Sequence, residues 1–270
     1  MNLLAKLSIT IMLLGILTLP LTAAIDDGLL LYFNFDSANG DVVADLSGGG
    51  HDGTLKADAD ITANAKNGSG ALQIEGGDET MEVETFAELE EYQANTYLFW
   101  INFTAPASGG WDQIMAKPAP GSDRSPGLWV TPEGLSIHYR YNPDNLGPWG
   151  ITKTGNQNGD FFDENTWYHI AGVTADGEVV CYVNGVEVAR EAAPAEIAQG
   201  AGSDDTGGLH VGNSPAYGGP AAQFIIDDLA VYNRALSADE VAALMTGDPM
   251  TAVDASGKII SAWGSIKSQY

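Results

Sequence analysis

The chain has 270 residues, 44% of them hydrophobic, which suits one large β-sandwich or two small domains. Its 36 Asp and Glu outnumber its 11 Lys and Arg, giving a formal net charge of −25. A surface this acidic repels phosphate backbones and anionic lipids, so nucleic acid and membrane surfaces are not expected partners. The acid surplus has two open explanations, solubility and the binding of hard divalent cations. The single cysteine, Cys181, excludes an intramolecular disulfide.

Residues 1–24 have the pattern of a secretory signal peptide. Lys6 gives a weakly basic start, 7–19 form an apolar run, and small residues at 22–24 suit a signal peptidase. The run is shorter than the ~20 apolar residues of a membrane-spanning helix, which disfavours the alternative of a retained anchor. We therefore predict a secreted protein, extracellular or periplasmic, with no membrane insertion after the signal is cleaved.

Short apolar segments bounded by turn residues follow along the mature chain, and this pattern predicts strands. The predicted strands are 29–35, 42–46, 71–75, 80–84, 96–103, 113–117, 127–130, 135–141, 166–173, 179–183, 186–189, 209–212 and 223–232. Asn184-Gly185 joins two of them as a type I′ hairpin turn. Alternation along 179–183 makes Cys181 a core thiol rather than a nucleophile.

Helical signals are few. Residues 86–92 fit a single helical turn, and Ser237 with Glu240 forms a capping box that opens a short helix ending near Met245. About a dozen strands before one late helix predict an all-β fold, a two-sheet antiparallel jelly-roll sandwich, over residues 25–248. Residues 249–270 are weakly patterned and are predicted to be a C-terminal tail.

Several segments, in this order and spacing, resemble the laminin G-like jelly rolls of the concanavalin A-like lectin/glucanase superfamily. They are LLLYFNFD (29–36), DLSGGGHDGTL (45–55), GSGALQIEGGDETMEV (68–83), YLFWINF (97–103), NTWYHIAGVTADGEVVCYVNGVEVA (165–189) and FIIDDLAVYNRALSADEVAALMTG (224–247). Each segment alone is weak evidence, whereas the ordered set is specific and covers about residues 27–247. The resemblance implies a concanavalin A-like domain that acts as a binding module.

The resemblance also implies a structural Ca²⁺. Its expected ligands are Asp36 after the first strand, Asp45 or the backbone of the glycine-rich loop near His51, and Asp227. Ca²⁺ takes 6–8 oxygen ligands, and a glycine-rich loop offers carbonyl groups without steric bulk. Alternation predicts that Asp227 points inward, where a carboxylate needs a cation or hydrogen bonds. The alternatives are a turn cap for Asp36 and backbone hydrogen bonding for Asp227, with Asp228 facing outward as a weaker candidate.

Some relatives of this fold are glycoside hydrolases, and the sequence gives little support for that chemistry here. Most glycosidases use two carboxylates that flank the scissile bond. The nearest pattern is Glu82-Val83-Glu84, which Phe86 follows without a third acid in register, so a solvated strand face explains it better. The motifs of serine hydrolases, zinc proteases and P-loop enzymes are absent from the sequence.

Exposed aromatic side chains in loops or on the concave sheet face are the expected sugar-binding groups, because their faces stack on apolar faces of sugar rings. The candidates are Trp111, Tyr141, Trp149 and Tyr217, with the polar side chains of Asn142, Asp144 and Asn145 nearby. Each aromatic has the alternative of anchoring a loop on the sandwich. Trp149, within the long polar segment 142–165, is the foremost. The sequence thus predicts a non-catalytic module that binds carbohydrate or an extracellular-matrix component. The alternatives are a protein-binding adhesion or scaffold domain and, less favoured, a glycosidase.

Overall fold

The computed structural model describes residues 24–120, 124–157, 159–200, 207–247 and 249–250. The predicted signal peptide, except for Ala24, and the predicted tail, except for residues 249–250, lie outside the described residues. No helix within the described ranges is long and apolar enough to cross a membrane.

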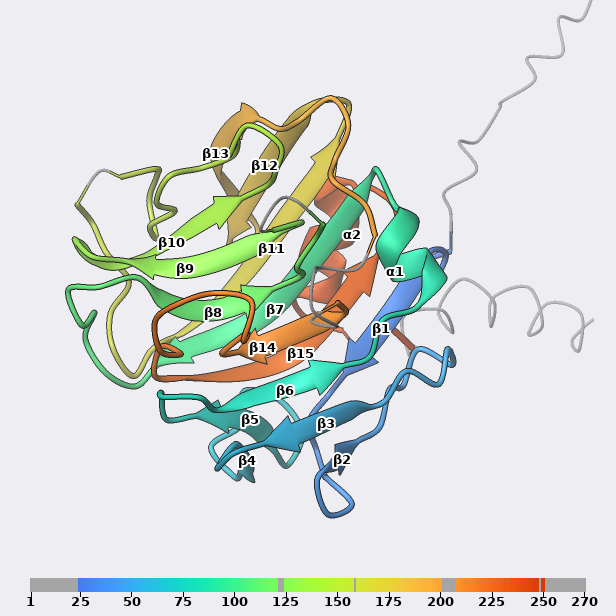
Figure 1. Cartoon of the computed structure of the whole chain (residues 1–270), viewed down its shortest axis with the longest axis vertical. Coiled ribbons are helices and arrows are strands. Elements are labelled where there is room, and N and C mark those ends of the chain that lie inside the picture. Colours follow the sequence, from blue (N-terminus) through green and yellow to red (C-terminus); the bar gives the residue numbers. More distant parts are fainter. Residues whose placement is uncertain (1–23, 121–123, 158, 201–206, 248, 251–270) are drawn as a thin grey trace, which may run out of the picture.

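Two antiparallel sheets pack face to face (Figure 1). Among the described residues the first sheet has eight strands, in the order β13 (Val186–Ala192), β12 (Glu178–Val183), β11 (Trp167–Ala175), β7 (Asn95–Phe103), β15 (Phe224–Tyr232), β5 (Ala71–Ile74) and β4 (Asp60–Thr62), with β1 (Leu29–Phe33) also paired to β15. The second has seven, in the order β10 (Gly134–Arg140), β9 (Gly127–Thr131), β8 (Asp112–Ala116), β14 (Leu209–Gly212), β6 (Thr80–Val83), β3 (Gly53–Lys56) and β2 (Val42–Val43). The predicted all-β two-sheet sandwich is confirmed.

The core lies between the two sheets and follows from alternation along each strand. On β7, Phe99 and Ile101 are fully buried in this core, whereas Leu98 belongs to a second cluster on the opposite face. Cys181 on β12 is also fully buried in the main core, and burial raises the pKa of its thiol well above the ordinary value. The interpretation of Cys181 as a core residue is confirmed.

Two short helices complete the domain, α1 (Ala87–Glu91) and the predicted late helix α2 (Ala238–Leu244). The capping box of α2 is present, since Ser237 Oγ accepts from Glu240 N and Glu240 Oε2 accepts from Ser237 N. Val241 and Leu244 bury their side chains with Tyr232 in the second cluster. The helix therefore covers part of the outer face of the eight-stranded sheet.

A bulge interrupts β15. The pairing with β7 shifts register between Asp227 and Ala230, and Asp228 has a φ of 49°. Before the bulge Asp227 is opposite Trp100, whose neighbours Phe99 and Ile101 face the core, so Asp227 points to the outer side of the sheet. The predicted inward direction of Asp227 is wrong, because uninterrupted alternation does not hold across an extra residue.

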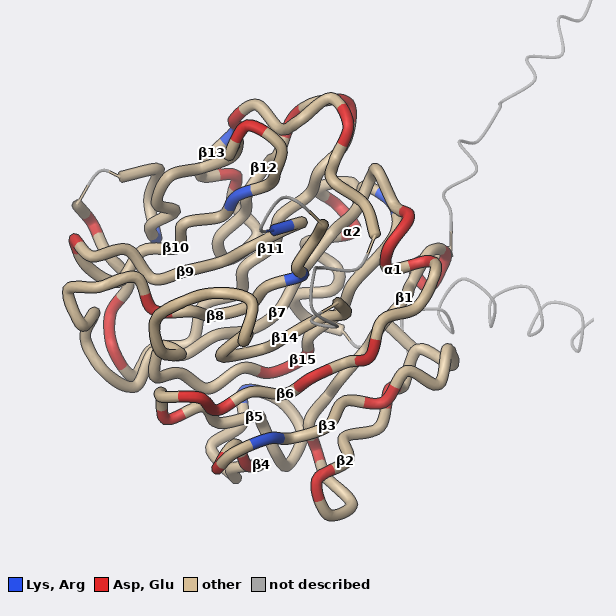
Figure 2. Tube along the Cα trace, in the orientation of Figure 1, with Lys and Arg blue, Asp and Glu red and all other residues tan. Residues whose placement is uncertain are grey.

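Acidic residues are distributed over most of the chain, and lysine and arginine are sparse (Figure 2). Glu82 on β6 contacts Lys56 across the strand pair at 3.5 Å, and both side chains are partly solvent-exposed. This arrangement matches the interpretation of Glu82 and Glu84 as a solvated strand face.

Candidate functional site

An aromatic pocket of about 320 Å³ lies on the outer face of the seven-stranded sheet, around β8, β9 and β10. We call it the aromatic pocket, and its lining residues are Trp111, Arg124, Trp129, His138, Asn145, Trp149 and Tyr217. Trp129 on β9 and His138 on β10 are paired cross-strand neighbours, whereas Leu128 and Ile137 beside them face the core. Alternation on these two strands therefore sets the floor of the pocket.

Trp149 is held beside this floor by backbone pairing. The segment after β10 was predicted to be a long polar loop, but it folds back onto the strand. Ile151 and Ile137 exchange two backbone hydrogen bonds of 2.7 and 2.9 Å, and Tyr139 N donates to Pro148 O at 3.1 Å. Trp149, which follows Pro148, is 37% exposed and is thus positioned by the sheet itself.

The aromatic rings meet edge to face. The rings of Trp111 and Trp149 are 84° apart with centroids separated by 5.6 Å, and each side chain is more than a third exposed. The ring of Tyr217 contacts Trp129 at 5.3 Å with an interplanar angle of 77°. Such packing fixes the ring planes while leaving indole surface open to a ligand.

His138 supplies a neutral polar group to the pocket. Its Nδ1 lies 2.7 Å from Trp149 O. Because a carbonyl oxygen only accepts, Nδ1 carries the proton and Nε2 of the neutral ring is left as an acceptor. Burial lowers the pKa of His138 to about 4, although the bond to Trp149 acts in the opposite direction. The ring is therefore uncharged at neutral pH.

Two arginines approach the same part of the pocket. The Arg124 guanidinium lies 5.2 Å from the centroid of Trp129, and that of Arg140 lies 5.7 Å from Trp149. Both donate to Asn145 Oδ1, Arg140 through Nε at 3.5 Å. Burial and then the charge of Arg124 lower the pKa of Arg140.

The structure brings three of the four predicted sugar-binding aromatics together, namely Trp111, Trp149 and Tyr217. Tyr141 is not among them, because it is fully buried in the core. Its hydroxyl donates to Asn95 Oδ1 at 2.7 Å and accepts from Thr174 Oγ1 at 2.9 Å. The expectation that Tyr141 is an exposed aromatic is wrong.

Asn145, expected beside the aromatic candidates, does line the pocket, whereas sequence reasoning missed Arg124, Trp129 and His138. A signal existed for His138, because the alternation of β10 turns it away from the core-facing Ile137 and Tyr139. Nothing local in the sequence marked Arg124, since it lies in a connection whose position depends on the tertiary fold.

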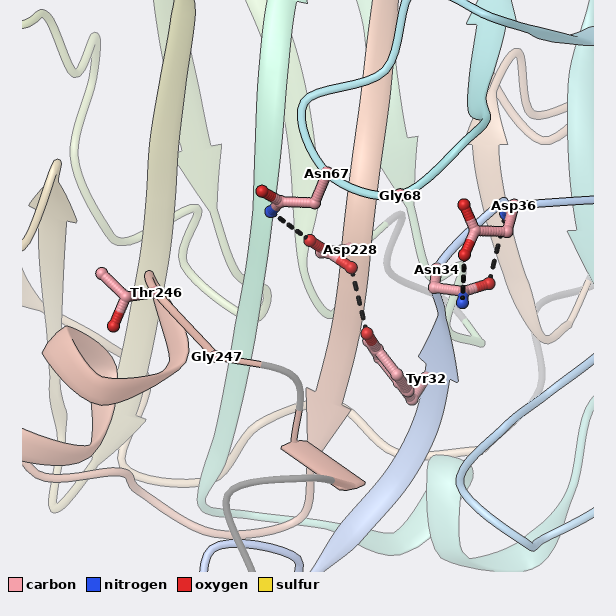
Figure 3. Close-up of a pocket in the computed structure, with 8 residues that line it drawn as sticks. All are labelled: Tyr32, Asn34, Asp36, Asn67, Gly68, Asp228, Thr246 and Gly247. Atoms are coloured by element: carbon pink, nitrogen blue, oxygen red, sulfur yellow. Dashed lines mark hydrogen bonds between the residues drawn. The ribbon is translucent and has the colours of Figure 1, made fainter.

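A second cavity, of about 250 Å³, is lined mainly by oxygen-bearing side chains. We call it the carboxylate pocket, and Figure 3 shows its lining residues: Tyr32, Asn34, Asp36, Asn67, Gly68, Asp228, Thr246 and Gly247. Asp228 Oδ1 accepts from Tyr32 Oη at 3.0 Å, and its Oδ2 accepts from Asn67 Nδ2 at 2.7 Å. The bulge in β15 directs Asp228 into this pocket, which lies on the outer side of the sheet, in agreement with the expected outward direction of Asp228.

Asp36 and Asp227 both fix the loop beside the carboxylate pocket. Asp36 Oδ1 accepts from the backbone and hydroxyl of Ser69, and Asp227 Oδ2 accepts from Lys66 N and Asn67 N at 2.9 and 3.0 Å. Asp227 has no exposed surface and does not line the pocket. Its burial raises its pKa to about 7, and the charge of Asp228 adds to the rise while the backbone donors oppose it.

Asp45, the third predicted calcium ligand, does not line the carboxylate pocket either. Its carboxylate accepts hydrogen bonds of 2.8–3.1 Å from Tyr32 N, from the backbone and hydroxyl of Ser47, and from His51 N. These bonds anchor the glycine-rich loop to β1 and occupy both oxygens. The three predicted ligands are therefore not brought together.

The lining of the carboxylate pocket consists of oxygen donors. Within the described ranges no group of three or more His, Cys, Asp and Glu is placed to hold a metal ion. Two carboxylates, Asp36 and Asp228, line the pocket together with the amides of Asn34 and Asn67. Donors of this kind are the ones that Ca²⁺ takes, since it accepts amide and carbonyl oxygens beside carboxylates.

Comparison with solved structures finds the same fold in other proteins. Domain 4 of a GH43 extracellular arabinanase from Geobacillus stearothermophilus, in complex with arabinotriose, is 18% identical with a TM-score of 0.60, over 81% of this chain and 98% of that one. The binding domain of Paraclostridial mosquitocidal protein 1 is 16% identical with a TM-score of 0.60, over 82% and 52%.

A Trypanosoma rangeli sialidase in complex with sialic acid is 18% identical with a TM-score of 0.59, over 81% of this chain and 33% of the sialidase. The chain thus spans about a third of the sialidase's length. At such identities the likeness shows the fold alone.

No curated protein matches the sequence. A family model does match, over residues 75–242, and by it the chain belongs to the concanavalin A-like lectin/glucanases superfamily.

Proposed function

We propose that this protein is a secreted, non-catalytic carbohydrate-binding module whose binding site is the aromatic pocket. The observation that carries the proposal is the pair Trp111 and Trp149, which present partly exposed indoles at 84° above a floor of Trp129 and His138. Angled aromatic faces accommodate sugar rings. The neutral acceptor of His138 and the amide of Asn145 supply the directional contacts that orient a polar ligand.

The solved relatives support this function. The arabinanase domain that matches this chain over 98% of its own length is a complex with arabinotriose. Secretion, which the leader at residues 1–24 predicts, would place the module among extracellular glycans, including those of an extracellular matrix. The wider family contains both lectins and glucanases, so the fold alone does not establish the function. The proposed function therefore depends on the residues of the aromatic pocket.

The non-catalytic part of the proposal is supported by the lining of the aromatic pocket. Most glycosidases place two carboxylates around the scissile bond. The described residues that line this pocket include no Asp or Glu. The carboxylates of Asp36 and Asp228 lie in a different pocket and are engaged in hydrogen bonds with Asn34, Ser69, Tyr32 and Asn67.

A glycan array probed with the mature protein tests the proposal. We expect binding to a restricted set of oligosaccharides, with loss of signal for Trp149→Ala and no change for Val186→Ala, an exposed residue on β13. Absence of binding to every glycan, in the presence of calcium, contradicts the proposal. Release of reducing sugar from polysaccharides contradicts its non-catalytic part.

We further propose a structural Ca²⁺ in the carboxylate pocket, held by Asp36 and Asp228 with the amide oxygens of Asn34 and Asn67. When bound, the ion would supply positive charge beside Asp227 and Asp228, whose carboxylates repel each other. It would also tie the 66–69 loop to β1 and β15. This role is structural, since the aromatic pocket is built from other residues.

A further inference from the structure

The charge of the aromatic pocket is unusual for this protein. The chain has 36 acidic and 11 basic residues, yet the described lining of the pocket includes Arg124 and no carboxylate. Arg140 does not line the pocket itself, but its guanidinium lies 5.7 Å from the ring centroid of the lining residue Trp149. Two of the four arginines are therefore at or beside one small cavity of an acidic protein.

Five cations of the described residues form ion pairs within the protein, whereas Lys66 lies over the ring of Trp100. The residues with a carboxylate partner at 3.5 Å or less are Lys56, Lys117, Lys153, Arg190 and Arg234. Arg140 differs from them. It donates to Asn145 Oδ1 and Gly147 O, which are uncharged acceptors, and forms no ion pair with any described residue. Its positive charge is therefore not neutralised by direct contact.

The two guanidinium groups also lie close to each other, because both donate to the single oxygen Asn145 Oδ1. The charge of Arg124 acts on Arg140 more strongly than that of Glu191, the acidic group that opposes it. Like charges held near one another in a partly buried position repel, and an anion between them would relieve that repulsion. Guanidinium groups bind carboxylate and sulfate through paired, charge-assisted hydrogen bonds.

We propose that the aromatic pocket selects a sugar that carries an anionic group, a carboxylate or a sulfate, with Arg124 and Arg140 binding that group while the ring stacks on Trp111 or Trp149. The proposal rests on the carbohydrate-binding function proposed above and specifies its ligand class. The pocket volume of about 320 Å³ suits a chain end or a short segment rather than a long polysaccharide stretch.

Titration calorimetry with matched charged and neutral sugars tests the selectivity for an anionic sugar. One pair is tetragalacturonate and its fully methyl-esterified form, which share the ring and linkage but differ in charge. A chondroitin sulfate tetrasaccharide provides sulfate, and arabinotriose and cellotetraose are neutral probes. We expect at least about tenfold tighter binding of one anionic probe than of every neutral probe, and weakening of that binding by salt.

Variants assign the effect to the two arginines. Arg140→Gln and Arg124→Gln, which keep a hydrogen-bond donor and remove the charge, should each lower affinity for the anionic probe at least about tenfold more than they lower affinity for a neutral probe. Arg190→Gln is the matched control, because Arg190 lies on β13 and pairs with Glu178 and Glu187. Melting temperatures of all three variants verify that they fold.

The outcomes separate this proposal from the one on which it rests. Equal or tighter binding of neutral sugars, lost on Trp149→Ala and unaffected by Arg140→Gln and Arg124→Gln, overturns the anionic selectivity and leaves the carbohydrate-binding function standing. Absence of binding to all probes, and to a wider array, overturns the binding function itself. Preference for the sulfated over the uronate probe also supports the proposal.

Discussion

The indole rings of Trp111 and Trp149 meet edge to face, with centroids 5.6 Å apart, although the two residues lie in separate connections between strands. Trp111→Ala and Trp149→Ala should therefore each weaken sugar binding by about 30-fold or more, as for a central aromatic anchor. Titration calorimetry with the best glycan from an array measures the loss. Val186→Ala is the control, and variants that bind as tightly as wild type would place the ligand elsewhere.

Removal of calcium should destabilise the fold. A ligand that binds only the native state at about 100 times its Kd contributes about 2.7 kcal/mol to the free energy of unfolding. We expect a higher melting temperature with calcium than with a chelator, and an Asp228→Asn variant that shows a reduced difference. Asp58→Asn, at an exposed position, is the control. Coincident melting temperatures for wild type with and without calcium refute the site.

Ionisation of Asp227 should make the calcium-free protein less stable as pH rises from about 4 to 7. The pKa of Asp227 is about 7 in the native state, above the ordinary value of 3.8. A raised native pKa means that folding takes up a proton between these values, so the stabilisation is complete below 3.8 and is lost as pH rises through 7. Asp227→Asn, which cannot ionise, should therefore gain stability more steeply than wild type as pH rises from about 5 to 7 in urea unfolding curves. An unchanged slope in that variant would contradict the assignment.

Two buried histidines should act in the opposite direction over the same range of pH. Burial lowers the pKa of both His138 and His169 to about 4, from the ordinary 6.5. For groups with depressed native pKa values the unfolded chain binds protons first, so stability is full above 6.5 and is lost as pH falls toward 4. Because two histidines oppose the single carboxyl of Asp227, the calcium-free protein should be most stable near pH ~7. Urea unfolding of His169→Gln should show a shallower acid limb than wild type.

Lys117→Met should be strongly destabilising although it removes a charge from the interior. Lys117 is 1% exposed, and its Nζ lies 2.8 Å from Glu90 Oε2, which is also buried. Removing the cation leaves Glu90 as an uncompensated buried charge, a loss of about 3–5 kcal/mol in the free energy of unfolding. Urea denaturation measures it. Lys153→Met, which breaks a surface pair with Asp163, should cost about 1 kcal/mol or less.

Tyr141→Phe distinguishes the core role of this residue from the sugar-binding role that its sequence context suggested. The variant loses hydrogen bonds to Asn95 and Thr174 and should reduce the free energy of unfolding by about 1–2 kcal/mol. Affinity for glycan should be unchanged, because the side chain does not reach the aromatic pocket. A selective loss of affinity without loss of stability would contradict the structure.

Much of the fold could be predicted because its signals are local. Alternation, turn dipeptides and the Ser237 capping box each act within a few residues, and together they determined the late helix, the inward position of Cys181 and the strands other than β3 and β4. The same alternation also contained the correct position of Tyr141, since it shares the core face of Ile137 and Tyr139. Treating Tyr141, the last residue of the predicted strand 135–141, as an exposed aromatic overlooked that signal.

The sites depended on relations that no local pattern contains. The extra residue at the β15 bulge directs Asp228 rather than Asp227 into the carboxylate pocket, and alternation cannot reveal an insertion in pairing with another strand. Likewise, Arg124 and Arg140 converge on Asn145 only because three separate segments fold against one another. The sequence by itself determined a β-sandwich with aromatic residues in its connections. Only the tertiary structure decided which aromatics share a pocket and which charges surround them, because contacts between distant segments are set by sheet pairing.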